Sequence, residues 1–463
     1  MIPVPAAAGP GGDGVGGPDP FDRRRARGAS GVLAAFNGAG VLDAADVHVA
    51  LRLGALGGEA DEAVLLGAAL AVRALRLGHV CTDLAAVRDT VTSDLAGPEE
   101  LQALPWPDGD GWGRRLAGSP VVAAGDADPP TAPLRLVGRR LYLDRYWRQE
   151  CEVAADLVAR SRAPVPGVSA PVLDGGLARL FGAAEVGGGP DLQRLAAAVA
   201  VGRRVSVIGG GPGTGKTTTV ARVLALLHDQ AAAGGSPPPR VALAAPTGKA
   251  AARLEEAVRG EAARIDVDEA TRDRLLRLEG STLHRLLGWR PDSRSRFRHH
   301  RGNRLPHDVV VVDETSMVSL SLMAKLVEAV RPSARLVLVG DPEQLASVEA
   351  GAVLGDIVGP AATGAAPAAG APAGSIGDCI VVLRRVHRYG GGIAELASAV
   401  QRGDADGAMA VLAGHRPDVE WLPADLAGPG SARAMEPVRR AVAEAGAAVV
   451  DGARRGDGTS ALA

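Results

Sequence analysis

The chain has 463 residues, more than one hydrophobic core usually supports, so two or three domains are expected. Its 51 Lys and Arg residues nearly balance 53 Asp and Glu residues, which leaves a net charge of −2. This balance excludes a globally basic, histone-like mode of nucleic-acid binding, so any nucleic-acid site must be local. The 3 cysteines are widely spaced, which argues against a disulfide scaffold and against a zinc or iron–sulfur site.

The sequence contains no run of about 18 uncharged apolar residues, the length that a membrane-spanning helix requires. The N-terminus lacks the charged start and the apolar run of a signal peptide. We therefore expect a cytoplasmic protein that does not interact with membranes.

The first third of the chain alternates between low-complexity and helical patterns. Residues 1–40 are rich in Gly, Ala and Pro and are predicted to be disordered. Residues 41–165 are predicted to form a mainly helical docking domain, because apolar residues recur there at helical spacing. A hairpin is expected at Leu134–Leu143, turning at Gly138, followed by a helix over Asp144–Arg162.

After a linker at 166–190, residues 191–358 alternate short β-branched runs with helical patterns. This alternation predicts an α/β fold with a parallel sheet covered on both faces. Residues 359–377 form an Ala/Gly/Pro-rich insertion, and a partial second α/β domain is expected over 378–463, beginning at Ile380–Leu383. The strands predicted in the first α/β domain are Val205–Ile208, Val241–Ala245, Val309–Val312 and Leu336–Val339.

The strongest motif is Gly210–Thr217, a complete G-x-x-x-x-G-K-[ST] between a predicted strand and a predicted helix. Glycines let backbone amides surround phosphate oxygens, and the helix N-terminus attracts anions. Lys216 is predicted to contact the β- and γ-phosphates of ATP, and the Thr217 hydroxyl to bind Mg²⁺. The predicted phosphate-binding residues are Gly210, Gly211, Pro212, Gly213, Thr214, Gly215, Lys216, Thr217 and Thr218.

Two further predicted strands end in catalytic candidates. Val309–Val312 is followed by Asp313, a candidate Mg²⁺ ligand, and by Glu314, a candidate general base for the attacking water. The strand before Gly340 leads to Asp341 and Gln344, and a glutamine at this place can contact the γ-phosphate or the water.

Candidate nucleic-acid contacts lie between these motifs. Thr247 and Lys249 stand at a helix start that suits an anion, and a polynucleotide phosphate is favoured over a second nucleotide. Trp289 and Phe297 could stack bases within an arginine-rich stretch, although a solvated loop is an equal alternative. The arginines of this stretch are Arg285, Arg290, Arg294, Arg296, Arg298, Arg301 and Arg304.

Another arginine, Arg388, could stabilise charge on the γ-phosphate from the second α/β domain. A surface arginine without such a role is an equal alternative at this position.

These motifs together resemble the superfamily 1 DNA helicases, whose ATPase core is a RecA-like P-loop NTPase. The segments on which this resemblance rests are GGPGTGKTTT (Gly210–Thr219), APTGKAA (Ala245–Ala251), STLHRLLG (Ser281–Gly288), VVVVDETSMV (Val309–Val318), VGDPEQLASVEAGAVLGDI (Val339–Ile357) and HRYGGGIAELA (His387–Ala397). Two N-terminal stretches narrow the resemblance to the RecD subunits, RALRLGHVCTDL (Arg73–Leu84) and LYLDRYWRQE (Leu141–Glu150).

The resemblance implies a 5′–3′ DNA helicase that works with RecB and RecC in the RecBCD complex, exodeoxyribonuclease V. Its substrate would be single-stranded DNA from double-strand break ends, for recombinational repair, and its cofactors ATP and Mg²⁺. Gln193 would contact adenine, and Thr247, Lys249 and His284 would contact DNA.

Nothing like the family's later Ser-Gln-Gly and Thr-Arg-Ala motifs follows His387. We therefore expect the chain to stop inside the second RecA-like domain and to be a weak ATPase at best. Two alternatives remain, a nucleotide-binding assembly subunit and a stand-alone conjugation-type helicase.

Overall fold

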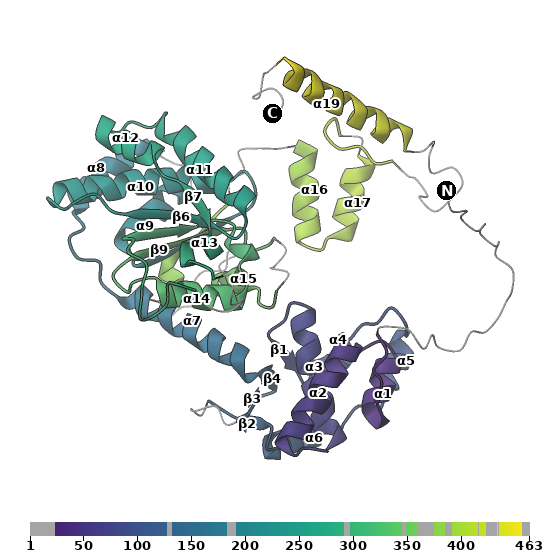
Figure 1. Cartoon of the computed structure of the whole chain (residues 1–463). Coiled ribbons are helices and arrows are strands. Elements are labelled where there is room, and N and C mark those ends of the chain that lie inside the picture. The colour runs from purple at the N-terminus through teal and green to yellow at the C-terminus, as the bar shows by residue number, and fades with distance from the viewer. Residues whose placement is uncertain are drawn as a thin grey trace, which may run out of the picture. The chain divides into compact units, whose positions relative to one another are not determined.

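In the computed structural model the described residues are 24–126, 132–182, 191–290, 297–344, 349–359, 375–384, 391–414, 416–422, 433 and 435–455. The chain divides after Arg384 into two compact units, residues 1–384 and 385–463 (Figure 1). Within the described ranges, no helix combines the length and the apolar character needed to cross a membrane.

The first part of unit 1 packs helices against a small sheet of strand order β1-β4-β3-β2. The predicted hairpin is confirmed, with antiparallel β3 and β4 joined at Gly138, whose φ of 60° favours glycine. The predicted helix that follows is also confirmed, as α7. The elements are α1 (Gly31–Gly38), α2 (Ala44–Gly57), α3 (Glu62–Arg76), β1 (Cys81–Asp83), α4 (Val87–Thr90), α5 (Pro98–Gln102), α6 (Gly109–Gly118), β2 (Val122–Ala124), β3 (Leu134–Val137), β4 (Arg140–Leu143) and α7 (Asp144–Arg162).

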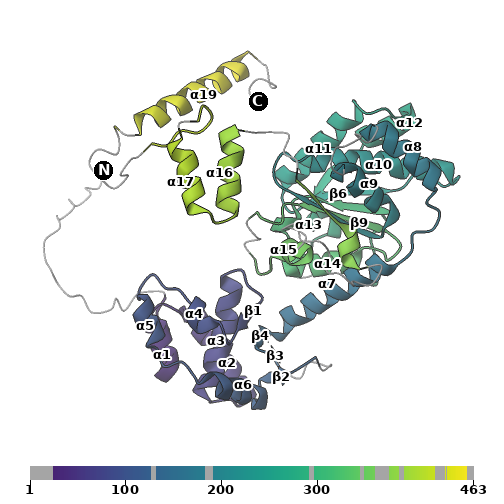
Figure 2. The ribbon, with the colours of Figure 1, turned by 180° about the vertical axis from the view of Figure 1, so that it is seen from behind.

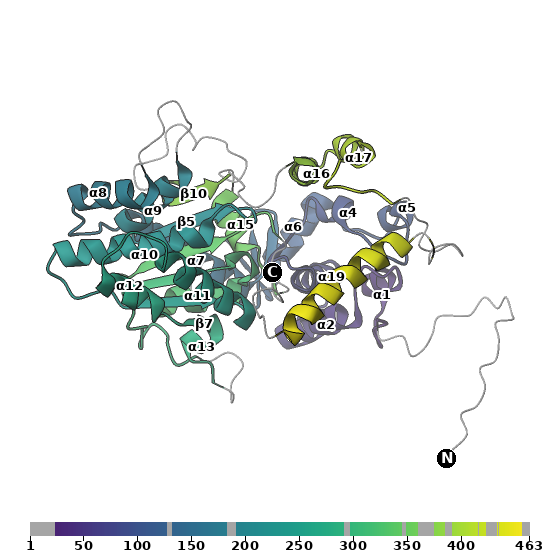
Figure 3. The same cartoon turned by 90° about the horizontal axis from the view of Figure 1, so that it is seen from above.

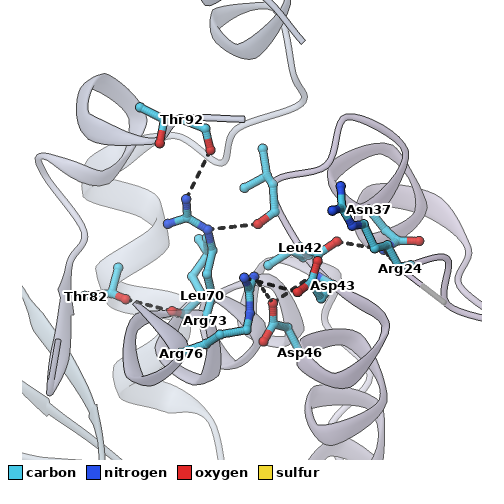
Figure 4. Close-up of polar contacts among 11 residues, drawn as sticks. Arg24, Asn37, Leu42, Asp43, Asp46, Leu70, Arg73, Arg76, Thr82 and Thr92 are labelled. Carbon is cyan, nitrogen blue, oxygen red and sulfur yellow. Dashed lines mark hydrogen bonds and ion pairs between the residues drawn. The ribbon is translucent and has the colours of Figure 1, made fainter. Parts of the chain in front are cut away.

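Helix α3 is the centre of this part and is held by polar contacts at its C-terminal end (Figure 4). The Arg73 guanidinium donates to the Val41 carbonyl at 2.8 Å, and Arg76 forms ion pairs with Asp43 and Asp46 at 3.1 and 2.9 Å. These contacts join α3 to the start of α2 and so fix the position of the two helices relative to each other.

The rest of unit 1 is a six-stranded, wholly parallel sheet of order β10-β5-β9-β8-β6-β7. The parallel α/β fold predicted from the sequence is therefore confirmed. The elements are α8 (Ala170–Phe181), α9 (Leu192–Gly202), β5 (Val205–Gly210), α10 (Lys216–Ala233), β6 (Val241–Ala245), α11 (Gly248–Ala262), α12 (Glu269–Leu276), β7 (Gly280–Thr282), α13 (Leu283–Leu287), β8 (Val309–Val312), η1 (Thr315–Met317), α14 (Leu320–Ala329), β9 (Arg335–Gly340), α15 (Val353–Val358), η3 (Ile376–Cys379) and β10 (Ile380–Leu383).

Helices cover both faces of this sheet (Figures 1 and 3). In β8, Val309 and Val311 pack into the core formed with α8 to α12, whereas Val310 and Val312 pack into the core formed with α7 and α13 to α15. All four β8 side chains are buried, because a strand covered on both faces has no polar side. The continuous valine run is the sequence signature of that environment.

Three sequence predictions are wrong. Residues 31–38, predicted to be disordered, form α1, because Leu33 and Phe36 are buried against the helical layer. The predicted linker at 166–190 contains α8, whose Leu177 and Leu180 pack into the core of the larger sheet. Ile380–Leu383 does not begin a second α/β domain, because β10 pairs in parallel with β5 and becomes the edge strand of the first sheet. A run of four apolar residues predicts a strand, but it does not predict which neighbouring strand this one pairs with.

The described elements of unit 2 are helices, α16 (Gly391–Gln401), α17 (Ala405–Ala413) and α19 (Glu436–Arg454), joined by turns and irregular segments. Helices α16 and α17 pack against each other. The Asp418 carboxylate accepts from the backbone N–H groups of Gly392 and Ile393, at 3.2 and 3.1 Å, and so satisfies donors at the start of α16. No strand occurs in the described residues of this unit, so a partial second RecA-like domain stays a prediction.

The hairpin provides a stability test. Arg135 is 1% exposed and donates to Asp144 at 2.5 Å and to the Gly125 carbonyl at 2.8 Å. Arg135→Ala is expected to lower the free energy of unfolding by about 2 kcal/mol, because the buried Asp144 carboxylate loses one of its two arginine partners and keeps only Arg148 at 3.1 Å. Urea unfolding followed by tryptophan fluorescence measures this loss.

The control is Arg139→Ala in the same hairpin, whose pair with Asp83 at 3.1 Å is exposed. It should cost less than about 1 kcal/mol. Equal effects of the two variants would contradict the role given to Arg135.

Candidate nucleotide-binding site

The glycine-rich loop joins the end of β5 to the start of α10. Gly210, Gly213 and Gly215 have φ values of 148°, 76° and 84°, which side chains rarely adopt. A Cβ at Gly215 would lie 2.3 Å from the Nε2 atom of Gln193, and one at Gly210 would lie 2.7 Å from the Leu383 carbonyl oxygen. The loop therefore needs glycine both for its conformation and for the space around it.

Lys216 is the first residue of α10, and its ammonium group lies inside the curve of the loop. Its Nζ atom donates to the carbonyl oxygens of Gly210 and Gly211 at 2.5 and 3.0 Å. Burial lowers the pKa of Lys216, while the carboxylates of Asp341, Asp313 and Glu314 act in the opposite direction. The lysine thus faces three acidic side chains from two other strand ends.

The strand order explains why these groups meet. β9 lies between β5 and β8, with Gly209 paired to Gly340 and Val312 paired to Leu338. Because parallel strands present their carboxyl ends at one edge, Asp341 follows β9 between the glycine loop and the end of β8. Asp341, which the sequence placed at this strand end without giving it a role, is only 4% exposed. Its position after a buried strand was the available signal.

Asp313 is a buried carboxylate whose environment suits a divalent cation. It is 9% exposed, and its Oδ1 atom accepts from the backbone N–H of Glu314 at 2.8 Å. Burial raises the pKa of Asp313 to about 6, which marks a charge poorly compensated by its surroundings. Carboxylate oxygen is a preferred Mg²⁺ ligand, and a nearby dication would favour the ionised form.

Glu314 has a left-handed backbone, with φ 50°. Among the described non-glycine residues it alone has positive φ. Such strain persists where the surrounding structure imposes it, and it is concentrated at functional sites. The turn also places Glu314 directly after the cation candidate Asp313.

The remaining predicted nucleotide contacts lie around the same loop. Thr214 is buried, and its hydroxyl donates to the Gly211 carbonyl at 2.9 Å. Thr217 and Thr218 are half-buried in the first turn of α10. The Gln193 side chain donates to the Thr214 carbonyl at 3.0 Å, so it lies beside the glycine loop, and its contact with adenine stays a prediction.

The structure gives less information on two of the residues predicted to contact the γ-phosphate, Gln344 and Arg388. Gln344 is exposed, and its backbone N–H donates to the Asp341 carbonyl at 3.3 Å. Arg388 lies outside the described residues, so the structure does not place it.

The predicted DNA contacts lie at the same edge of the sheet, beyond β8. Because Ala245 pairs with Thr282, the loop after β6 and the start of α13 are neighbours. Thr247 caps α11, with its hydroxyl oxygen accepting from Ala250 N–H at 3.2 Å, and Lys249 is exposed. His284 is also exposed, and its ring centroid lies 5.8 Å from that of Phe297.

Comparison with known proteins gives a consistent result. A family model described as "RecBCD enzyme subunit RecD, N-terminal domain" matches residues 38–142, and one described as "AAA domain" matches residues 193–350. "RecBCD enzyme subunit RecD" from Mycolicibacterium smegmatis is 55% identical over 394 residues, which cover 85% of this chain and 64% of that protein. Over 85% of its length the chain is therefore similar to RecD subunits.

Two other relatives are consistent with this similarity. The protein of the same name from Mycobacterium tuberculosis is 52% identical over 398 residues, covering 85% of this chain and 62% of the relative. The "ATP-dependent RecD2 DNA helicase" of Deinococcus radiodurans is 43% identical over 150 residues, covering 32% of this chain and 17% of that protein. The chain thus spans just under two thirds of the length of the two RecD relatives.

The two RecD-like stretches of the N-terminal part are neighbours in space. β1 and β4 pair antiparallel, with Cys81 opposite Tyr142 and Thr82 opposite Leu141. The first stretch also reaches the larger α/β part, because Gly351 N–H donates to the Gly78 carbonyl at 2.9 Å. The RecD-specific sequence therefore lies where the small sheet meets the larger α/β fold.

The loop geometry predicts the effect of adding one methyl group. Gly215→Ala is expected to weaken binding of a fluorescent ATP analogue by about tenfold or more, because the Cβ meets Gln193 and the φ of 84° is strained. Fluorescence titration gives the dissociation constant.

Gly202→Ala at the end of α9 is the matched control, since a Cβ there meets nothing within 4 Å. It should bind as the parent does. Unchanged binding in Gly215→Ala would contradict the proposed position of the phosphates.

Proposed function

We propose that the chain is the ATP-driven motor of a RecBCD-type DNA helicase. The observation that carries this proposal is the meeting of Lys216 with Asp313, Glu314 and Asp341 at one edge of a parallel sheet. A phosphate-binding loop alone serves many functions, whereas acidic strand ends beside it supply what hydrolysis needs. The RecD names of the relatives support the helicase class.

In this proposal the glycine-loop amides and Lys216 bind the phosphates of ATP, and Gln193 contacts adenine. Thr217 and Asp313 would hold Mg²⁺, which neutralises charge on the β- and γ-phosphates when bound. Glu314 orients a water and accepts its proton as the water oxygen attacks the γ-phosphorus and the bond to the bridging oxygen breaks. Gln344 contacts the γ-phosphate or the water, and Arg388 stabilises the developing charge.

We further propose that residues 191–358 act as the first RecA-like domain and residues 41–165 as a docking domain for RecB and RecC. The family match over residues 38–142 supports the second assignment. Thr247, Lys249 and His284 would contact single-stranded DNA, and movement would run 5′ to 3′ from double-strand break ends. These assignments rest on family resemblance.

Replacing the loop lysine tests the motor proposal. Lys216→Gln is expected to lower DNA-stimulated ATP hydrolysis by about 100-fold or more, because a preorganised positive charge is lost from the transition state. Phosphate release in the presence of single-stranded oligonucleotide measures the rate.

Arg162→Gln is the control, since this exposed residue lies at the far end of α7. It should hydrolyse ATP as the parent does. Full activity in Lys216→Gln, or ATP binding without any turnover in the parent chain, would overturn the motor proposal, and the second result would favour an assembly subunit.

A second variant separates binding from chemistry. Glu314→Gln is expected to bind the ATP analogue with unchanged affinity yet to hydrolyse ATP about 100-fold more slowly or worse, because the base is lost while the phosphate contacts remain. Analogue titration and single-turnover hydrolysis measure the two quantities. Loss of binding instead would assign Glu314 to nucleotide affinity.

A further inference from the structure

A cleft of about 800 Å³ lies beside the contact between α7 and α14. Figure 2 shows α7 running from the N-terminal part to the sheet, where it packs on α14. The lining includes Arg145, Tyr146 and Gln149 of α7, Lys325 of α14, and His284 and Phe297 at the other end. The cleft therefore begins at a predicted DNA contact and continues along α7.

Hydrogen bonds fix the first turns of α7 on α14. The Ser321 hydroxyl donates to the Gln149 Oε1 atom at 2.9 Å, and Arg145 donates to the Ser321 oxygen at 3.4 Å. The Arg145 guanidinium lies 5.2 Å from the centroid of the Tyr146 ring. This wall of the cleft is thus held before any ligand binds.

Two cations of the lining are available to an anion. Arg145 has no carboxylate partner among the described residues. Lys325 pairs with Glu328 at 3.0 Å, but this helical pair is solvent-accessible, and such pairs contribute little energy. Arg76, also in the lining, is already committed to Asp43 and Asp46 (Figure 4).

Among the described residues, one carboxylate lines the cleft, and it has a hydrogen-bond partner. Glu349 accepts from the Ser319 hydroxyl at 2.8 Å. This hydrogen bond leaves the negative charge of Glu349 in place, but the described lining carries three cations, Arg76, Arg145 and Lys325, so its net charge is positive.

Aromatic rings complete the lining. Phe297 is half-buried opposite Trp289 in an antiparallel bridge, and its ring lies near that of His284. Tyr146 stands on the α7 side. Cations spaced among aromatic rings are what proteins use to bind single strands, through phosphate contacts and base stacking.

We propose that this cleft is a further subsite for single-stranded nucleic acid, continuous with His284. Arg145 and Lys325 contact phosphates there, and the aromatic rings contact bases. The inference rests on the proposed function, which it extends from the edge of the sheet onto α7.

The test uses Arg145→Gln combined with Lys325→Gln in the full chain, and fluorescence anisotropy with a labelled oligothymidine of about 20 nucleotides, longer than one compact binding site. The double variant should bind about tenfold more weakly at moderate salt, since each lost phosphate contact removes electrostatic affinity. The slope of log affinity against log salt should fall by about 1.4, or about 0.7 for each contact. Both side chains are solvent-accessible, so folding should be retained, which thermal melting checks.

Two controls separate the outcomes. Arg162→Gln on the same helix should leave DNA affinity unchanged, and Lys249→Gln should weaken it. If Lys249→Gln weakens binding while the double variant binds with parental affinity and slope, the cleft proposal is overturned and the motor proposal stands. If the parent chain binds no single-stranded DNA, both proposals fail.

Discussion

A half-buried ammonium group under the electrostatic influence of three carboxylates is the constraint on which the candidate nucleotide site depends. Lys216 loses hydration inside the glycine loop, and three acidic side chains offset part of that loss. Asp313 has the complementary difficulty, because burial raises its pKa to about 6. Each charge is energetically unfavourable without a partner in a low-dielectric pocket. A triphosphate with its cation would supply the charges that both groups lack, so the site is organised for a ligand before it binds.

The sheet order creates this arrangement. With β9 placed between β5 and β8, three strand ends deliver a phosphate loop, Asp341 and Asp313 to one edge. The same edge continues through β6 and β7 to Thr247 and His284. The candidate nucleotide contacts and the candidate DNA contacts therefore both follow strands of one parallel sheet.

Helix α7 gives the N-terminal part a physical link to this support. It leaves the small sheet after β4 and contributes Val153 and Leu157 to the core below the large sheet. The two RecD-like stretches pair through β1 and β4 at the start of this helix. The N-terminal part, attached in this way, is coupled to the larger α/β fold by buried apolar contact, which is stiffer than a linker.

Much of this protein could be read from local sequence. Four consecutive valines required burial on both faces, the glycine pattern required a phosphate loop, and Gly138 marked the hairpin turn, because each depends only on residues close in the chain. Tertiary structure alone decided that Ile380–Leu383 joins β5, that Asp341 is enclosed beside Lys216, and that Arg145 and Lys325 line the same cleft. Those outcomes depend on which distant segments become neighbours, and the free energy of that choice comes from packing and desolvation across the whole core.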